Sequence, residues 1–265
     1  METKSFSHQL KHGGIHHEEH QEDIVARAVY LNNAAACYIE NGDYGTAISN
    51  LNRILTDIKN LLRTHNSSPN TVAQSCFQFG EWMRLPYAIG EGEEPNANKL
   101  CTKTPRALHQ NSEEEDYIYR HPIYIPDQAF KSINLTGEQD CLAVLLTVIS
   151  LFNVALAHQL LAMESRSNRR FCLQKSSRLY ELGYHLAATN KIDGGSLFLL
   201  SILNNLGHVY KTLSCHIKAS KCFQQLLSTL MYLSEGCKCD DLAALSGFFG
   251  STCYLYIQDF CAAAA

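Results

Sequence analysis

The stretch Leu203-Asn-Asn-Leu-Gly-His-Val-Tyr210 decides the fold, because two further stretches of the chain share its pattern. They are Leu31-Asn-Asn-Ala-Ala-Ala-Cys-Tyr38 and Leu151-Phe-Asn-Val-Ala-Leu-Ala-His158. Each has leucine first, asparagine third, alanine or glycine fifth and a ring last. Self-similarity of this kind indicates a helical repeat, whose units cannot bury their apolar faces alone and share one core.

The three stretches resemble the first helix of a tetratricopeptide unit, where tyrosine follows a small residue by three positions. The resemblance places an alanine in the second helix twelve residues after the small one, then large apolar residues four and seven positions further. The third stretch fits at every point, with Gly207, Tyr210, Ala219, Phe223 and Leu226. The first fits with Ala35, Tyr38, Ala47, Leu51 and Ile54.

The middle stretch departs from this spacing. About nine extra residues, near Met163 to Phe171, separate Ala155 from Ser176, where alanine is expected, with Tyr180 after it. The run Ile202 to Tyr210, with Cys222 to Gln224, Leu226 to Leu230 and Phe248 to Cys253, is also similar to an expanded family of tetratricopeptide-like proteins in unicellular photosynthetic algae. That likeness implies no activity or ligand.

The rest of the pattern predicts an all-α fold of about seven helices with a long, partly ordered insertion, and the resemblance implies that the helices form a tetratricopeptide-like α–α superhelix. Apolar residues at helical spacing predict a first helical pair over 22–64, split at Asn41-Gly42-Asp43, with Gly42 ending one helix and Asp43 capping the next. Residues 138–265 are expected to form two further pairs and a capping helix. The five helices of this part are predicted near 138–163, 169–188, 195–212, 215–235 and 241–262.

Two segments interrupt the helices. Residues 1–21 are polar and are expected to form a flexible, His-rich tail, whose end can run into the first helix. Residues 65–137 contain all six prolines and are expected to be mostly irregular, draped over the helices by aromatic residues. Within them Tyr117 to Ile125 alternates, which is typical of a short extended piece, although Pro122 and Pro126 argue against a central strand.

Composition narrows the functional class. The chain has 22 basic and 26 acidic residues, which gives no basic footprint for nucleic acid. The first ten residues lack the apolar core of a signal peptide, and eleven scattered cysteines are typical of reduced thiols, so a cytoplasmic or nuclear location is expected. No P-loop, dinucleotide fingerprint, nucleophile elbow or kinase-like set occurs, so neither an enzyme nor a cofactor is expected.

The candidate binding residues are five asparagines, a histidine and a lysine on or near the first helices. By the resemblance, these helices line a groove that holds peptides. The candidates are Asn32, Asn33, Asn153, Asn204, Asn205, His208 and Lys211. An asparagine amide can donate to and accept from a partner's backbone. The alternative is structural, with Asn33, Asn153 and Asn205 bonding neighbouring helices.

The family's clamp for C-terminal carboxylates uses lysine beside these asparagines. The matching places here hold Asn32, Phe152 and Asn204, so no such clamp is expected.

Metal and membrane binding are weaker hypotheses. Histidines at helical i, i+4 spacing can share one ion, but no HExxH motif occurs; the histidines concerned are His8, His12, His16, His17 and His20. Cys237 and Cys239 lack a second cysteine pair at zinc spacing. Cys141 to Met163 carries no charge and could span a bilayer, but Asn153, His158 and Gln159 are costly there, and a central repeat helix explains its apolar character better.

These observations predict an adaptor or scaffold that binds another protein or peptide along its inner helices. The alternative hypothesis is a protein in which residues 68–137 fill the groove themselves, as an autoinhibitory or purely structural element.

Overall fold

The computed structural model describes residues 12–64, 117–126, 139–190, 196–234 and 245–255, with the backbone alone for 12–22, 61–64, 139–141 and 196. This part contains seven helices and no strand, which confirms the all-helical prediction for it. The helices are α1 (His12–Glu40), α2 (Tyr44–Thr64), α4 (Gln139–Glu164), α5 (Arg169–Thr189), α6 (Ser196–Thr212), α7 (His216–Ser234) and α9 (Ser246–Thr252).

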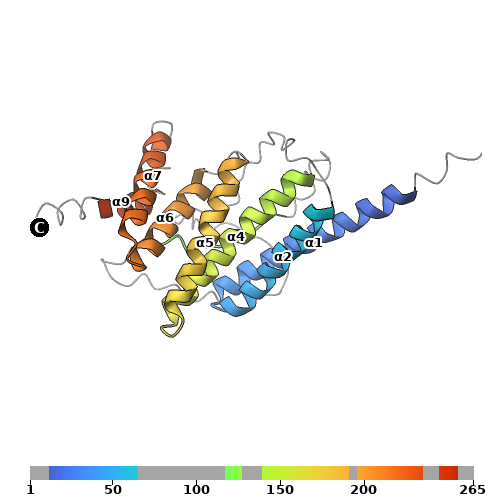
Figure 1. The fold of residues 1–265 in the computed structure, drawn as a ribbon, viewed down its shortest axis with the longest axis horizontal. Helices are drawn as coiled ribbons and strands as arrows, with labels where there is room; N and C mark the ends of the chain where they lie inside the picture. Colours follow the sequence, from blue (N-terminus) through green and yellow to red (C-terminus); the bar gives the residue numbers. More distant parts are fainter. Residues whose placement is uncertain (1–11, 65–116, 127–138, 191–195, 235–244, 256–265) are drawn as a thin grey trace, which may run out of the picture.

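The helices pack in chain order. Three pairs are joined by short connections, α1 with α2, α4 with α5 and α6 with α7, and neighbouring pairs pack through α2 with α4 and α5 with α6. The succession runs across the molecule from α1 to α9 (Figure 1). Helix α4, the first of the second pair, also contacts α1, the first of the first pair. Helix α9 contacts both α6 and α7.

Residues 12–21, which the sequence places in a polar tail able to run into the first helix, belong to α1. Helix α1 begins at His12, ten residues before the expected start at Glu22. Once the apolar turns after Ile24 have formed, each added residue gains a backbone hydrogen bond, so propagation into a polar stretch is favourable. Residues 1–11 lie outside the described part.

The turn between α1 and α2 follows the predicted chemistry. Gly42 has a φ of 78°, a left-handed conformation that favours glycine. The N–H of Asp43 donates to Tyr38 O at 2.9 Å and that of Gly42 to Ile39 O at 3.1 Å, which together form a Schellman motif. Asp43 Oδ1 then accepts from the N–H of Thr46 at 3.1 Å and caps α2.

The turn between α6 and α7 repeats this geometry with a serine. Ser214 has a φ of 59°, and the N–H of Cys215 donates to Tyr210 O at 2.8 Å. Ser214 therefore takes the place of Gly42, and Tyr210 that of Tyr38. A residue with a Cβ is strained in this conformation, whereas glycine is not.

Close approach within a pair depends on the small fifth residue of each of the three similar stretches. A Cβ built on Gly207 would lie 2.7 Å from ring atoms of Phe223, which is itself fully buried. Ala35 and Ala155, at the equivalent places, are also completely buried. The small side chains thus let α2, α5 and α7 pack closely on their partners.

The nine extra residues of the middle unit are shared between both of its helices. Compared with the other pairs, α4 runs four residues further past the ring position, the connection 165–168 is one residue longer, and α5 begins four residues earlier. Ser176 still packs at the expected place, where its hydroxyl donates to Ala155 O at 2.8 Å.

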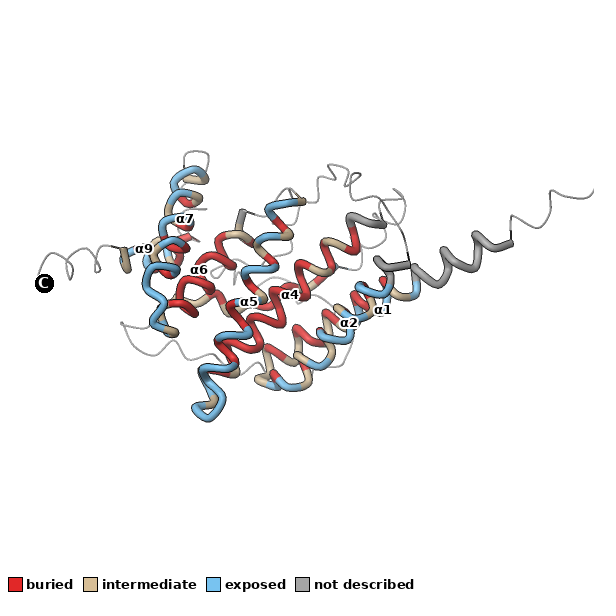
Figure 2. The backbone as a smooth tube through the Cα atoms, viewed as in Figure 1, coloured by how far each residue is buried: buried red, intermediate tan, exposed pale blue. Residues whose placement is uncertain are grey.

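Helix α4 lies at the centre of the core. Residues 151–160 are all buried, and the tube through α4 is red along most of its length (Figure 2). By length and composition Leu142–Glu164 could cross a membrane, but 83% of its apolar window is buried by the rest of the protein. Burial in a helical core accounts for this composition.

Residues 117–126 carry no helix or strand assignment and form the green coil of Figure 1. We refer to them as the segment. The predicted helix over 241–262 is described from Leu245 to Leu255, with α9 as its regular part.

Candidate functional site: an asparagine row that holds residues 117–126

Three asparagines at the same position of the three similar stretches each hold one residue of the segment by both backbone groups. Asn205 Oδ1 accepts from the N–H of Tyr119 at 2.9 Å, and its Nδ2 donates to Tyr119 O at 2.9 Å. Asn153 does the same for Ile123, at 2.8 and 3.0 Å.

Asn33 completes the series. It accepts from the N–H of Ile125 and donates to Ile125 O, both at 2.8 Å. Asn33, Asn153 and Asn205 are the third residues of the three similar stretches, so the repeat in the sequence places one amide on each of α1, α4 and α6.

The chemistry of this contact is that of a β-ladder. A carboxamide presents one acceptor and one donor side by side, as does the backbone of a facing strand residue. Every backbone group that the asparagines hold belongs to an odd-numbered residue of the segment, which is the period of an extended chain. The contact requires no particular side chain.

Two further asparagines each donate to one carbonyl of the segment: Asn32 shares Ile123 O with Asn153, and Asn204 adds Tyr117 O. Asn32 donates to Ile123 O at 2.9 Å, and Asn204 donates to Tyr117 O at 2.9 Å. Each thus reaches the residue two positions before the one held by its chain neighbour. Asn32, Asn153, Asn204 and Asn205 are completely buried, so these bonds are shielded from water. The asparagine row is Asn32, Asn33, Asn153, Asn204 and Asn205.

The register of the segment is fixed and runs against the order of the units. Its first residues meet α6 and its last meet α1. Asn33 and Asn153 hold residues two apart, and Asn153 and Asn205 hold residues four apart, which correspond to roughly 7 and 13 Å of extended chain.

The segment also buries side chains in the helical core. The ring of Tyr119 lies 6.2 Å from those of Phe152 on α4 and Phe248 on α9. Tyr119, Ile123 and Ile125 are at most 2% exposed, and all three belong to the main hydrophobic cluster.

Helix α9 closes the first end of the segment. The Tyr117 and Phe248 rings meet edge to face at 5.2 Å, and a Cβ on Gly247 would lie 2.4 Å from the Tyr117 ring. Ser251 Oγ lies 3.4 Å from Tyr117 O and 3.0 Å from His208 Nε2. His208 therefore supports the segment through Ser251.

At the other end Tyr124 joins the segment to α1. Its hydroxyl donates to Glu40 Oε2 at 2.7 Å and lies 3.6 Å from Cys37 Sγ. Burial, followed by the Glu40 carboxylate, holds the pKa of Tyr124 far above its ordinary value, so this hydroxyl remains a donor.

The structure brings five of the seven candidate residues into direct contact with the segment. His208 acts through Ser251, and Lys211 lies over the Tyr254 ring, 5.4 Å from its centroid. Bonds between helices also occur: Asn153 donates to Asn32 at 3.0 Å, and Asn205 to the Tyr180 hydroxyl at 3.0 Å.

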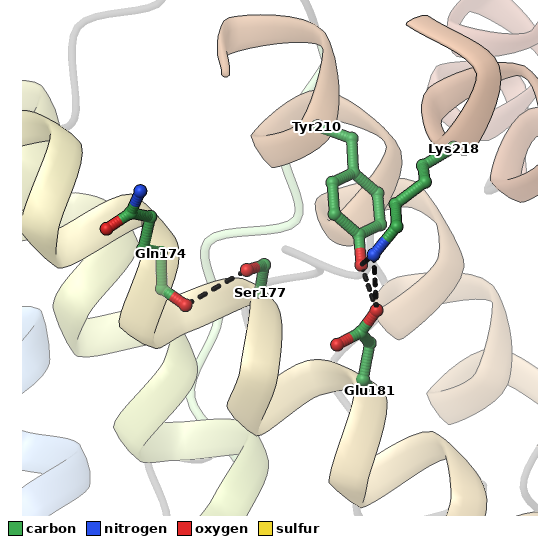
Figure 3. Close-up of polar contacts among 5 residues, drawn as sticks. All are labelled: Gln174, Ser177, Glu181, Tyr210 and Lys218. Carbon is green, nitrogen blue, oxygen red and sulfur yellow. Dashed lines mark hydrogen bonds and ion pairs between the residues drawn. The ribbon is translucent and has the colours of Figure 1, made fainter. Parts of the chain in front are cut away.

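A second polar cluster links α5, α6 and α7 (Figure 3). The Tyr210 hydroxyl donates to Glu181, and Lys218 Nζ lies 3.3 Å from the same carboxylate. Burial, and then Glu181, raise the pKa of Tyr210. On α5 itself, Ser177 donates to Gln174 O at 3.0 Å. The ion pair is half-exposed, so we assign this cluster a role in joining helices.

Two buried side chains of the core, the Cys222 thiol and the His158 imidazole, are poorly suited to nucleophilic or acid–base chemistry. Burial, then Glu181, raise the pKa of Cys222 to about 12, which keeps it protonated at neutral pH. Burial, then Lys175, lower the pKa of His158 to about 4, and His158 Nδ1 has no hydrogen-bond partner within the described residues.

No group of three or more His, Cys, Asp or Glu side chains in the described residues could hold a metal ion. Cys237, Cys239, His8 and the side chains of His12 to His20 lie outside that description.

Sequence reasoning missed the residues that hold side chains of the segment. Phe152 and Phe248 enclose Tyr119, and Ser251 reaches Tyr117 O. One signal was available: Phe152 stands at the second place of its stretch, where Asn32 and Asn204 stand in theirs. The alternation over 117–125 was the other signal.

No protein-family model, curated protein or solved structure matches this chain.

Proposed function

We propose that this chain is a non-enzymatic, tetratricopeptide-like repeat protein that binds an extended peptide along its asparagine row, and that its own segment occupies this site. The observation that carries the proposal is the threefold contact of Asn33, Asn153 and Asn205, each with both backbone groups of one residue. Side-chain amides at every unit suit the recognition of a backbone, whichever chain supplies it.

The connections of the segment support regulation by displacement. Fifty-two residues separate Thr64 from Tyr117, and twelve separate Pro126 from Gln139. A tethered ligand of this kind competes with a partner at an effective concentration set by its linkers. A partner must therefore displace the segment, which makes the resting protein autoinhibited.

A second candidate is a purely structural role, in which the segment completes the core and is never displaced. The observation that favours it is the near-complete burial of Tyr119, Ile123 and Ile125 in the main hydrophobic cluster. Apolar burial on this scale stabilises a fold as well as a complex.

Replacement of residues 117–126 by ten glycine and serine residues in the full chain separates the two candidates. We expect the chain to stay helical by circular dichroism and to bind a synthetic peptide of residues 117–126 with one-to-one stoichiometry in calorimetry. Peptide at a hundred times its Kd should stabilise the chain by about 2.7 kcal/mol. Asn153→Ala with Asn205→Ala, in the same background, should abolish binding.

A helical chain that binds no peptide would contradict the peptide-binding proposal. A chain that loses its helices when the segment is replaced would favour the structural role.

A further inference from the structure

The segment reveals which partner the asparagine row would accept, an inference that rests on the proposed function. The asparagines accept backbone N–H groups of the segment at three positions, and only there does the site require an N–H. The N–H groups of Tyr119, Ile123 and Ile125 are held, each by a carboxamide oxygen. None of the five asparagines holds the N–H of Ile118 or Arg120.

The prolines of the segment obey the same rule. Proline has no N–H, so it can stand only where no acceptor needs one. Pro122 and Pro126 occupy two positions that the asparagines do not use. The site therefore tolerates proline between the held residues and excludes it at them.

Side-chain burial adds a second requirement. Tyr119 is enclosed by Phe152 and Phe248, an arrangement that favours an aromatic ring over an aliphatic side chain. Ile123 and Ile125, four and six positions later, are buried, and β-branched residues suit an extended chain. Arg120, which lies between Tyr119 and Ile123, is only partly buried.

We propose that the partner is an extended segment of another protein with an aromatic residue, then β-branched residues four and six positions later. Those three residues carry free backbone N–H groups, and prolines are accepted elsewhere. The partner runs from α6 towards α1, as the protein's own segment does. Selectivity thus comes from three N–H groups, one ring and two buried β-branched side chains, and the other side chains are free to vary.

The test uses the full chain with one protease site within residues 65–116 and another within 127–138. After cleavage, a fluorescent peptide of residues 117–126 exchanges with the untethered segment, and anisotropy reports its uptake. Unlabelled peptides compete, each with a single N-methyl group that removes one N–H and leaves the side chain intact. The uncut chain, whose segment remains tethered, is the control and should take up far less peptide.

We expect N-methylation at Tyr119, Ile123 or Ile125 to weaken competition by about tenfold or more, because each leaves a buried carboxamide oxygen unsatisfied. N-methylation at Ile118 or Arg120 should change the peptide's competition by less than about threefold. Tyr119→Ala should weaken it by about tenfold, and Arg120→Ala should not.

Equal effects of N-methylation at held and unheld positions would overturn this inference while leaving peptide binding intact. Failure of the native peptide to exchange, or equal uptake by the uncut chain, would overturn the proposed function as well. A dimer of the uncut chain that Ile123→Pro abolishes in sedimentation would make a second copy the occupant and overturn a foreign partner.

If the cleaved chain precipitates, proline substitutions in the uncut chain still test which backbone N–H groups are held. Ile123→Pro should lower its Tm by several degrees more than Arg120→Pro. Equal losses would overturn the inference.

Discussion

Substitution of Asn205 tests most directly whether the asparagine row stabilises the fold. Its amide satisfies both backbone groups of Tyr119 in a completely buried place. Asn205→Ala removes the two partners at once and leaves a buried donor and a buried acceptor. We expect the free energy of unfolding to fall by about 3 kcal/mol, measured by urea denaturation.

Asn190→Ala is the matched control, because the Asn190 amide donates only to Leu186 O of its own helix. This change should cost less than about 1 kcal/mol. Similar losses for the two variants would mean that the segment adds little to the fold.

The buried His158 side chain should make the free energy of unfolding depend on pH. The folded chain keeps its pKa at about 4, whereas the unfolded chain protonates near the ordinary value of 6.5. Between these values the unfolded state binds more protons, so stability is fully present above pH 6.5 and falls as the pH drops towards 4.

The measurement is the free energy of unfolding of the native chain relative to that of His158→Gln. This difference should shift by about 3 kcal/mol against the native chain between pH 7 and pH 4. A difference that stays constant with pH would show that His158 titrates normally in the folded chain.

The two helix-ending turns form a natural pair at the scale of elements. Gly42 and Ser214 occupy the same position in the same motif, both with positive φ. Ser214→Gly should raise the free energy of unfolding by about 0.5–1 kcal/mol, and Gly42→Ala should lower it by about as much.

Space does not complicate this comparison, since a Cβ on Gly42 would meet no atom within 4 Å. Thermal unfolding of the two variants measures both changes. Destabilisation by Ser214→Gly would contradict the equivalence of the turns.

The helices could be predicted from the sequence because their signals are local. Apolar spacing, Gly42 and Asp43 all act within a few residues, and the structure places α2, α4, α5, α6 and α7 within a few residues of the predicted ranges. The residue at which α1 begins could not be predicted, because propagation into a polar stretch leaves no apolar pattern.

The asparagines of the site could be predicted from the sequence, but the residues that they hold could not. The asparagines stood out because they recur, but nothing periodic links Asn205 to Tyr119, 86 positions away, or Asn33 to Ile125, 92 positions away. Such pairings depend on how the units stack, which fixes the distance between successive amides. The alternation over 117–125 indicated an extended piece without saying which surface would receive it.

At the scale of the whole molecule, the segment is the element that the three helical pairs share. It contacts α1, α4, α6 and α9 through backbone bonds or rings. A chain that crosses all units couples their stability in a way that nearest-neighbour stacking alone does not. Displacement by a partner would therefore exchange one shared extended segment for another.

Hydrogen exchange of the backbone amides of 117–126, resolved residue by residue by nuclear magnetic resonance, tests this central claim most directly. The account predicts an alternating pattern, in which the amides of Tyr119, Ile123 and Ile125 exchange slowly and those of Ile118 and Arg120 exchange much faster. Uniformly fast exchange across all five amides would contradict it, because the segment would then not be held by the asparagine row.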